Sequence, residues 1–271
     1  MDRRPIGVFD SGLGGLTAVR ELTALLPNED IIYFGDTGRV PYGSRSRETI
    51  IQYARQDVAF LRSFDLKAIV IACGTVSSTA LDALTAENSI PILGVVEPSA
   101  RAAVHATRNG VIGLIGTQAT IRAGVYDRRI RALRPEARII DVPCPLLVPL
   151  VENGRFRPGD PVVETVIREY LAPIREAGAD TLVLGCTHYP LLQEVIANEL
   201  GPQVALIDSG AQSARAAQCL LTEEDALNTP EHTGTCRYFV SDTVDSFSSL
   251  ASVFLRRDVT GSVAQVDITK Y

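Results

Sequence analysis

The chain has 271 residues, of which 46% are hydrophobic and 21% charged, and its formal net charge is −6. A globular chain of this length forms one large domain or two ordinary ones and folds without disulfides. The acidic balance argues against general binding to nucleic acid, which requires a basic face. No apolar run approaches the roughly 20 residues that span a bilayer, and no secretory signal is evident, so we expect a cytoplasmic protein.

Short apolar, β-branched runs alternate with longer amphipathic stretches along the chain. The runs predicted as strands are 6–9, 31–35, 68–72, 90–96, 111–116, 137–142, 181–185, 204–208 and 237–241. The stretches predicted as helices are 16–26, 47–64, 79–87, 160–178, 190–200 and 213–221. Apolar strands that alternate with helices are typical of α/β folds with largely parallel sheets. Nine strands are compatible with one wide sheet or with two smaller ones.

Three segments of the first half recur in the same order in the second half. IGVFDSG (6–12) is echoed by IGLIGTQ (112–118), VIACGT (70–75) by VLGCTH (183–188), and PILGVVEPSA (91–100) by VALIDSGAQSA (204–214). Because a repeated order of segments indicates repeated structural units, we predict two similar lobes. Each would hold a mainly parallel sheet flanked by helices.

Polar clusters follow four of the predicted strands. Because ligands of α/β proteins bind beyond the carboxyl ends of strands, these clusters are candidate site residues. The clusters are Asp10-Ser11-Gly12, Asp36 with Pro41-Tyr42-Gly43, Cys73-Gly74-Thr75 and Cys186-Thr187-His188. The first continues as DSGLGG (10–15), a turn whose backbone N–H groups favour a small carboxylate. Thr17 stands where a dinucleotide-binding motif requires glycine, so a nicotinamide cofactor is not expected.

The five cysteines are scattered and contain no C-x-x-C pair, so neither a disulfide framework nor a zinc site is predicted. Two of them, Cys73 and Cys186, occupy equivalent places in the repeat, each at the end of a strand and the entrance to a helix. A helix N-terminus lowers the pKa of a thiol, so we expect reactive thiolates. His188, two residues from Cys186, is a candidate proton partner.

Two matched thiols on opposite sides of a cleft suit a racemase, which removes a proton from one face of a carbon and returns one to the other. A nucleophilic hydrolase needs one cysteine with a base, and a redox enzyme needs a second cysteine close enough to pair. Lys67 and Lys270 are the only lysines, and neither follows a strand end, so a pyridoxal Schiff base is not expected. We expect no metal and no cofactor, with placed donors stabilising carbanion-like charge.

Several segments resemble, in order, the glutamate racemases of the aspartate/glutamate racemase family. They are DSGLGGLTAVREL (10–22), GDTGRVPYGSR (35–45), IACGTVSS (71–78), PLVENG (149–154), LGCTHYPLL (184–192), LIDSG (206–210) and the C-terminal RYFVSD with FSSLASVFL. The resemblance implies a first α/β lobe of residues 1–97 plus 208–271, a second of residues 98–207, and an active site in the cleft between them. It also implies a homodimer that interconverts L- and D-glutamate and supplies D-glutamate for peptidoglycan.

The same resemblance implies roles for single residues. Cys73 and Cys186 would be the two acid/bases, with Asp10 as partner of Cys73, and with His188 and Glu152 as partners of Cys186. The residues implied to hold the substrate are Asp10, Ser11, Tyr42, Gly43, Gly74, Thr75, Thr187 and His188. Gly74 departs from the family, which usually has Asn there. We predict that Thr75 and backbone groups bind glutamate without that amide, and less tightly.

Three alternatives stay open. A racemase of the same fold could act on aspartate or another acidic amino acid, because a one-methylene difference is not resolved by spacing. A relative that decarboxylates or isomerises would need only one thiol, so the pair at Cys73 and Cys186 counts against it. A catalytically silent acid-binding protein would show ordinary reactivity at both thiols. A further role in contact with another protein is not tested by the sequence.

Overall fold

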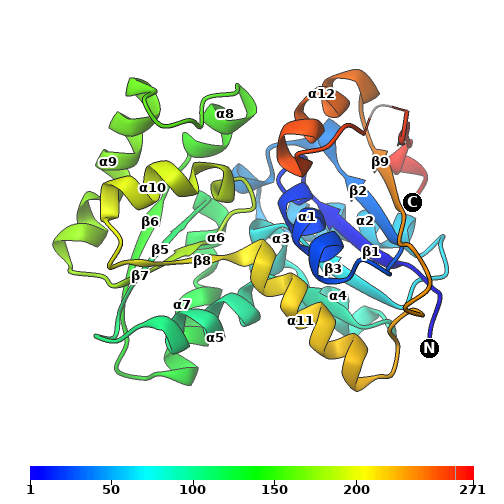
Figure 1. Ribbon diagram of the computed structural model, residues 1–271, viewed down its shortest axis with the longest axis horizontal. Coiled ribbons are helices and arrows are strands. Elements are labelled where there is room, and N and C mark those ends of the chain that lie inside the picture. Colours follow the sequence, from blue (N-terminus) through cyan, green and yellow to red (C-terminus); the bar gives the residue numbers. More distant parts are fainter. Residues whose placement is uncertain (260) are drawn as a thin grey trace.

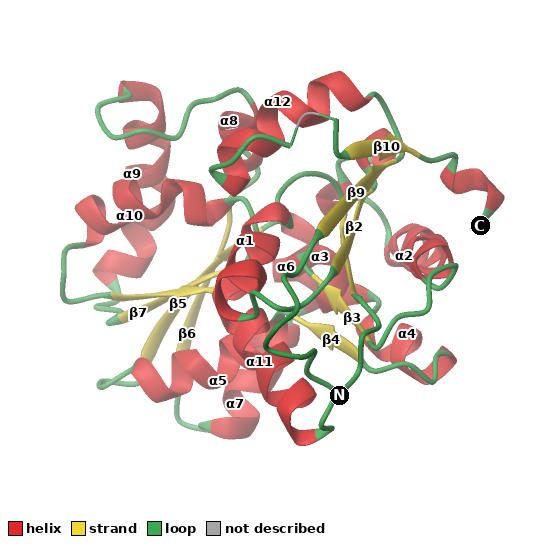
Figure 2. Cartoon of the chain, turned by 45° about the vertical axis from the view of Figure 1, so that its right-hand side comes forward, coloured by secondary structure: helices red, strands yellow, loops and turns green. Residues whose placement is uncertain are grey.

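The computed structural model describes residues 1–259 and 261–271, which form two β-sheets covered by helices (Figures 1 and 2). The larger sheet has the order β10-β9-β2-β1-β3-β4 and the smaller one β6-β5-β7-β8, and every pair of neighbours is parallel. The strands are β1 (Ile6–Asp10), β2 (Ile31–Gly35), β3 (Ala68–Ile71), β4 (Ile92–Gly94), β5 (Val111–Gly116), β6 (Arg138–Pro143), β7 (Thr181–Leu184), β8 (Ala205–Asp208), β9 (Cys236–Val240) and β10 (Val263–Gln265).

Helices fill most of the segments between strands. The α-helices are α1 (Leu16–Leu25), α2 (Arg47–Leu61), α3 (Gly74–Thr79), α4 (Leu81–Glu87), α5 (Val96–Ala106), α6 (Gln118–Ala123), α7 (Val125–Leu133), α8 (Leu147–Glu152), α9 (Pro161–Glu176), α10 (Gln193–Leu200), α11 (Ser209–Glu223) and α12 (Val244–Leu255). Short 3₁₀ turns are η1 (Thr37–Arg39), η2 (Tyr42–Ser44), η3 (Tyr189–Leu192) and η4 (Ile268–Lys270). Helices α2, α6, α9 and α11 begin after a Ser, Thr or Asp whose side chain accepts a backbone N–H of the first turn.

The predicted internal repeat is confirmed by the topology. The order β2-β1-β3-β4 within the larger sheet is matched, strand for strand, by β6-β5-β7-β8 in the smaller sheet. The three echoed segments fall on the matched pairs β1 and β5, β3 and β7, and β4 and β8. The nine predicted strands are therefore divided between two similar α/β lobes, and they do not form one wide sheet.

The central strands hold the polar residues that follow them in fixed positions, because the buried apolar side chains of the strands anchor the strand ends. Every residue of β1, β2, β3 and β7 is buried. In the larger lobe, α2 and α4 cover one face of the sheet, and α1, α11 and α12 cover the other (Figure 2). Fully burying a branched apolar side chain contributes about 1.5–3 kcal/mol, so the ends of these strands are held firmly.

Several elements were not predicted from the sequence. Strand β10 has only three residues and α3, α6 and α8 have six each, whereas α5 and α7, with 11 and nine residues, were missed despite their length. Helices α5 and α8 also contain Pro98 and Pro149, which weaken a helical pattern. Isolated helices of this length are marginal, so packing against the sheets stabilises them.

The chain passes between the two sheets twice, once between β4 and β5 and once between β8 and β9. Helix α5, which follows β4, packs on both α7 and α11. The lobe boundaries at 97/98 and 207/208 lie near these crossings and stay a prediction.

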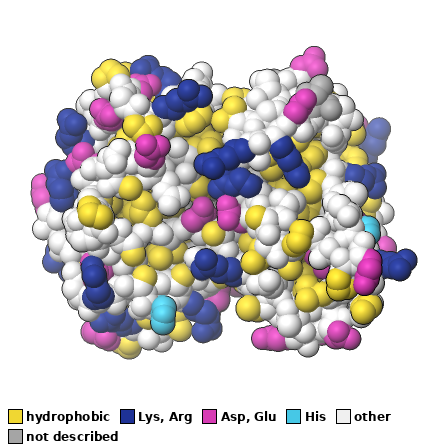
Figure 3. Space-filling model, in the orientation of Figure 1, with side chains coloured by type: hydrophobic (Ala, Val, Ile, Leu, Met, Phe, Trp, Pro, Cys, Tyr) yellow, Lys and Arg dark blue, Asp and Glu magenta, His cyan; other side chains and the backbone are white. Residues whose placement is uncertain are grey.

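On the surface, basic and acidic side chains are interspersed on the face shown in Figure 3, with small apolar patches among them. Within the described ranges, no helix is long and apolar enough to cross a membrane.

Candidate active site

A cavity of about 380 Å³ lies between the lobes, at the carboxyl ends of the central strands. It brings together ten of the eleven site residues named from the sequence. These are Ser11, Tyr42, Gly43, Cys73, Gly74, Thr75, Glu152, Cys186, Thr187 and His188. The eleventh, Asp10, is buried beside the cavity, where its carboxylate accepts a hydrogen bond from Thr187 Oγ1 at 3.5 Å.

The two cysteines occupy matched positions in the two lobes. Cys73 comes two residues after the end of β3, and Cys186 comes two residues after the end of β7. Cys73 directly precedes α3, as expected. Cys186 does not directly precede a helix, because η3 begins three residues later at Tyr189. Only one of the two predicted helix entrances is therefore correct.

Cys73 is a buried thiol with a polar neighbour in its own lobe. Its Sγ donates a hydrogen bond to Ser11 Oγ at 3.3 Å. Burial, together with the nearby charge of Asp10, raises the pKa of Cys73 to about 12. The expectation of a lowered pKa is wrong for this cysteine because desolvation outweighs the short helix α3. At neutral pH Cys73 carries its proton.

Cys186 is the first member of a chain of three side chains. Its Sγ lies 3.8 Å from His188 Nδ1, and His188 Nε2 lies 2.9 Å from Glu152 Oε1. Burial alone would lower the pKa of His188, but its hydrogen bonds to Cys186 and Glu152 outweigh burial and raise the pKa to about 10. The Phe254 ring packs perpendicular to the imidazole, with ring centroids 5.5 Å apart. A positively charged imidazole therefore faces the Cys186 sulfur at neutral pH.

Asp10 is held by the Gly-rich turn that follows it. The backbone N–H groups of Ser11, Gly12 and Gly15 point to its carboxylate, with Gly12 N at 3.1 Å from Oδ2. The N–H groups of the DSGLGG turn thus bind the carboxylate of Asp10 itself. The small carboxylate ligand expected at this turn would find these N–H groups already engaged. Burial outweighs these hydrogen bonds and raises the pKa of Asp10. Asp10 acts on Cys73 through its charge, whereas Ser11 makes the direct contact.

Tyr42 lies at the cavity with its hydroxyl turned away. The hydroxyl donates to Asp36, and Asp57 Oδ2 lies 3.2 Å from it. Arg39 joins the same network, with Nε 2.6 Å from Asp36 Oδ2 and Nη2 2.9 Å from Asp57 Oδ1. The Tyr42 hydroxyl is thus engaged by buried carboxylates, and the implied role of Tyr42 in holding the substrate stays a prediction. The network fixes η2, which carries Tyr42 and Gly43 to the cavity wall.

Two further hydrogen bonds join the lobes beside the cavity. Thr75 Oγ1 lies 2.9 Å from Thr117 Oγ1, which belongs to the other lobe. Thr17 Oγ1 donates to the backbone carbonyl of Thr187 at 2.9 Å. These hydrogen bonds hold the lobes close together where the two thiols meet the cavity.

The sequence reasoning missed part of the cavity wall. Gly12 and Pro41, named in the polar clusters, also line the cavity, and the missed lining residues are Val40, Ser44, Thr117, Gln118, Cys144, Pro145, Val148, Pro149 and Asn153. The internal repeat contained a signal for one of them, since Thr117 in IGLIGTQ stands where IGVFDSG has Ser11. Cys144 likewise follows β6, as Asp36 follows the matched strand β2.

Among the residues described, no group of three or more His, Cys, Asp or Glu side chains is arranged to hold a metal ion. The polar groups around the cavity are instead three thiols, hydroxyls, two side-chain amides, one imidazole, one carboxylate and backbone N–H groups. Such groups can accept and donate protons and can hold an acidic ligand.

Comparison with known proteins places the chain among racemases. The family model described as Asp/Glu/hydantoin racemase matches residues 14–217. The chain belongs to this family. The glutamate racemase of Geobacter metallireducens is 45% identical over 268 residues, which cover 99% of this chain and 98% of the relative.

Solved structures of family members share the whole fold. The glutamate racemase of Francisella tularensis in complex with D-glutamate has a TM-score of 0.92 and 39% identity, with all of both chains covered. An isoform from Bacillus anthracis also has a TM-score of 0.92 and 39% identity, with 98% of each chain covered. The two-lobed α/β architecture inferred from the sequence is therefore that of the glutamate racemases.

Proposed function

We propose that this protein interconverts L- and D-glutamate by proton transfer between two thiols, without a cofactor. The main observation in support is that Cys73 and Cys186 line one cavity and occupy equivalent positions in the two similar lobes. Glutamate as substrate is supported by relatives named glutamate racemase and by the D-glutamate in the Francisella tularensis structure.

In the proposed reaction, one sulfur acts as a thiolate and removes the Cα proton of glutamate. The electron pair of that C–H bond moves into the adjacent carboxylate, and the second thiol delivers its own proton to the opposite face of Cα. The first sulfur ends as a thiol and the second as a thiolate, so the reverse reaction starts from the product state. Hydroxyls of Ser11, Thr75 and Thr187, with nearby backbone N–H groups, would stabilise the developing charge.

The surroundings of the two thiols fit opposite starting states. Cys73, with its raised pKa, would supply a proton. The His188 imidazolium would stabilise negative charge on Cys186, and Glu152 would hold the imidazole in place. Each acid/base group thus has its partners in its own lobe.

The experiment that tests this function is incubation of the protein with D-glutamate in heavy water, without pyridoxal phosphate. Loss of circular dichroism, with deuterium appearing at Cα, is the expected result. Cys73→Ala and Cys186→Ala should each abolish racemisation, whereas Cys219→Ala, at an exposed cysteine, should not. If D-aspartate racemises and D-glutamate does not, the substrate assignment is wrong. If neither racemises with folded protein, the two-thiol mechanism is wrong and a binding protein is favoured.

We also propose that the protein works as a cytoplasmic homodimer that supplies D-glutamate for peptidoglycan. Two of its exposed large apolar side chains, Val40 and Leu146, lie at or beside the cavity wall, where a second copy could cover them. Sedimentation equilibrium should give twice the 29.2 kDa chain mass. A monomer at micromolar concentration would contradict the dimer without affecting the proposed reaction. Cell fractionation and D-glutamate auxotrophy on gene deletion test the other two parts.

A further inference from the structure

The imidazole of His188 is enclosed by residues of the larger lobe as well as by those of its own lobe. Within the smaller lobe, Nδ1 faces Cys186 and Nε2 faces Glu152. From the larger lobe, the Phe254 ring packs perpendicular to the imidazole, and the backbone of Gly14 lies against it. Enclosed from both sides, His188 is only 6% exposed.

Gly14, in the middle of the DSGLGG turn, leaves no room for a side chain. A Cβ at this position would overlap both His188 Nδ1 and Thr187 Oγ1. Nδ1 is the imidazole nitrogen that faces the Cys186 sulfur. Glycine at position 14 therefore lets the larger lobe close on the imidazole without pushing it away from Cys186.

Phe254 reaches the imidazole from α12, close to the end of that helix. The residue is 1% exposed, and its ring stands at 90° to the imidazole. Aromatic rings with centroids this close favour such a perpendicular arrangement. Arg20 of α1 donates to the Phe254 carbonyl at 3.5 Å, which ties the end of α12 to its own lobe. Figures 1 and 2 show α12 at the margin of the larger lobe nearest α8, the helix that ends at Glu152.

The contacts within the smaller lobe hold the imidazole only loosely. The distance of 3.8 Å from Cys186 Sγ to Nδ1 corresponds to a weak hydrogen bond, because sulfur is a weak donor and acceptor. The Glu152 side chain is 33% exposed, so water competes for its oxygens. Dense packing against a buried ring restricts the rotation of the imidazole plane, which these two hydrogen bonds do not fix firmly.

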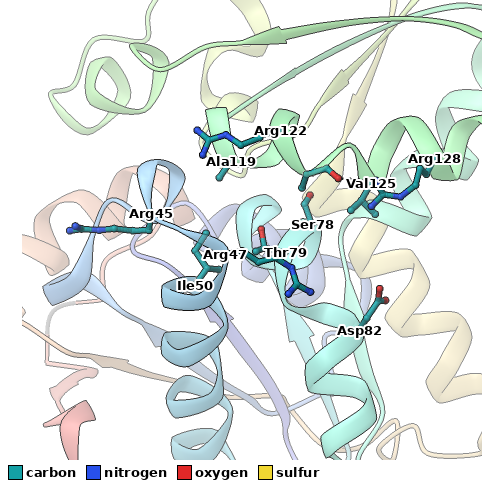
Figure 4. Close-up of a pocket in the computed structure, with 11 residues that line it drawn as sticks. Arg45, Arg47, Ile50, Ser78, Thr79, Asp82, Ala119, Arg122, Val125 and Arg128 are labelled. Carbon is teal, nitrogen blue, oxygen red and sulfur yellow. Dashed lines mark hydrogen bonds between the residues drawn. The ribbon is translucent and has the colours of Figure 1, made fainter.

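The lobes are not packed this tightly everywhere. A second cavity of about 260 Å³ lies between residues of α2, α3 and α4 in the larger lobe and residues of α6 and α7 in the smaller one (Figure 4). At the Thr187-His188 segment, by contrast, the larger lobe contributes Gly14, Phe254 and the hydroxyl of Thr17, which donates to the Thr187 carbonyl. Close contact is thus concentrated on the segment that carries the imidazole.

We propose that Phe254 and Gly14 are positioning residues that act across the lobe interface and hold the His188 imidazole between Cys186 and Glu152. Their effect on catalysis rests on the proposed racemase function, whereas their effect on the imidazole does not. Because both residues belong to the other lobe, the imidazole is fixed only while the lobes are together. Neither residue is among those that line the active-site cavity, so each acts on kcat and leaves the KM for glutamate nearly unchanged.

The test follows the His188 imidazole by NMR during a pH titration of the full chain labelled with ¹⁵N-histidine. The chain has three histidines, and His188→Asn identifies the signal. The titratable groups that act on this imidazole are Cys186, Glu152 and Asp10. In Phe254→Ala the imidazole loses burial and also the alignment of its hydrogen bonds. Since the hydrogen bonds outweigh burial, the pKa of His188 should fall from about 10 toward 6.5.

Gly14→Ala should lower the pKa of His188 in the same direction, from the opposite side of the ring. Both variants should also lower kcat by about tenfold or more, because a displaced imidazole no longer assists Cys186. Phe254→Leu keeps most of the apolar volume without the ring. It should give a smaller fall of the pKa, and it keeps the test available if the alanine variant does not fold.

Phe247→Ala is the matched control. Phe247 lies on the same helix and is also 1% exposed, but its ring packs on Tyr33, with centroids 6.2 Å apart. This variant should leave the pKa of His188 unchanged.

Each contrary outcome has a distinct meaning. A wild-type titration of His188 in both Phe254 variants would overturn the proposal. An equal fall of the pKa in Phe247→Ala would reduce the effect to general loosening of α12 and would also overturn it. A raised KM with unchanged kcat would place Phe254 in substrate binding instead. If the wild-type protein does not racemise glutamate and Phe254→Ala still shifts the titration, the proposed function is rejected and the positioning role stands.

Discussion

Gly74, the first residue of α3, lies directly against the backbone carbonyl of Gly185, which follows β7 in the other lobe. A Cβ at position 74 would overlap that carbonyl oxygen, and the obstacle is backbone, which cannot rotate away. Glycine here permits the close approach of two segments that each carry one of the two cysteines proposed as acid/bases.

Replacing Gly74 should therefore impair the reaction. Overpacking of this kind costs about 1–3 kcal/mol, so Gly74→Ala is expected to lower kcat/KM about tenfold or more by pushing the lobes apart. Gly74→Asn should act in the same direction, although it restores the family's amide. Steady-state kinetics with both variants make the comparison, with Gly38→Ala as a control whose added Cβ would meet nothing closer than the Ser241 hydroxyl at 3.3 Å. An improved KM in Gly74→Asn would instead support the missing contact predicted from the sequence.

The raised pKa of His188 makes part of the protein's stability depend on pH. A histidine whose pKa rises from 6.5 to about 10 on folding contributes stability that is complete below pH 6.5 and is lost as the pH approaches 10. Glu152→Gln should therefore destabilise the protein by about 1–3 kcal/mol near pH 6, and by little near pH 10. Urea denaturation across this range measures the difference. A difference that stays constant with pH would show that the Glu152 interaction does not depend on the imidazolium.

Removal of the Asp10 charge should make Cys73 easier to ionise. The charge of Asp10 is the second cause of the raised pKa of Cys73, after burial. Asp10→Asn keeps the shape and removes the charge, so the midpoint of Cys73 alkylation by iodoacetamide should move to lower pH while staying above that of a free cysteine. Peptide mass mapping of the modified residue follows Cys73 alone. The exposed Asp242→Asn serves as control, and an unchanged midpoint in Asp10→Asn would reject electrostatic coupling.

A buried ion pair far from the cavity is expected to control stability. Lys67 and Glu29 are 5% and 3% exposed and form an ion pair. Lys67 Nζ also donates to the carbonyls of Asp2 at 2.9 Å and Ala226 at 2.8 Å, so it joins the N-terminal segment to the loop after α11.

Removing one partner leaves the other charge buried and unpaired, which costs about 3–5 kcal/mol. Lys67→Met and Glu29→Gln should each lower the unfolding free energy substantially, and the double variant should lose less than the sum. Chemical denaturation of the three variants tests this. Additive losses would show that the two side chains are not energetically coupled.

The sequence alone predicts much of this molecule because its signals are local. Buried strands appear as apolar runs, and polar clusters after them mark the strand ends where Cys73 and Cys186 lie. The order of the echoed segments also predicts matched lobes, which the sheet topology confirms.

The remaining features depend on contacts that no local pattern encodes. The pKa of Cys73 is raised by burial, a property of the assembled core. The Tyr42 hydroxyl turns away from the cavity because it donates to Asp36 and lies beside Asp57 there. Lys67, correctly excluded as a pyridoxal lysine, is buried because Glu29 pairs with it.

The two crossings of the chain between the sheets have a mechanical consequence. A single connecting segment would let one lobe twist and tilt about the other in any direction. Two connections, after β4 and after β8, leave one easy relative movement, a swing about the line that joins them. Such a swing would carry Cys73 with Ser11, and Cys186 with His188, as intact units. A hinge motion of this kind would open and close the cavity for a ligand while the contacts within each lobe stay unchanged.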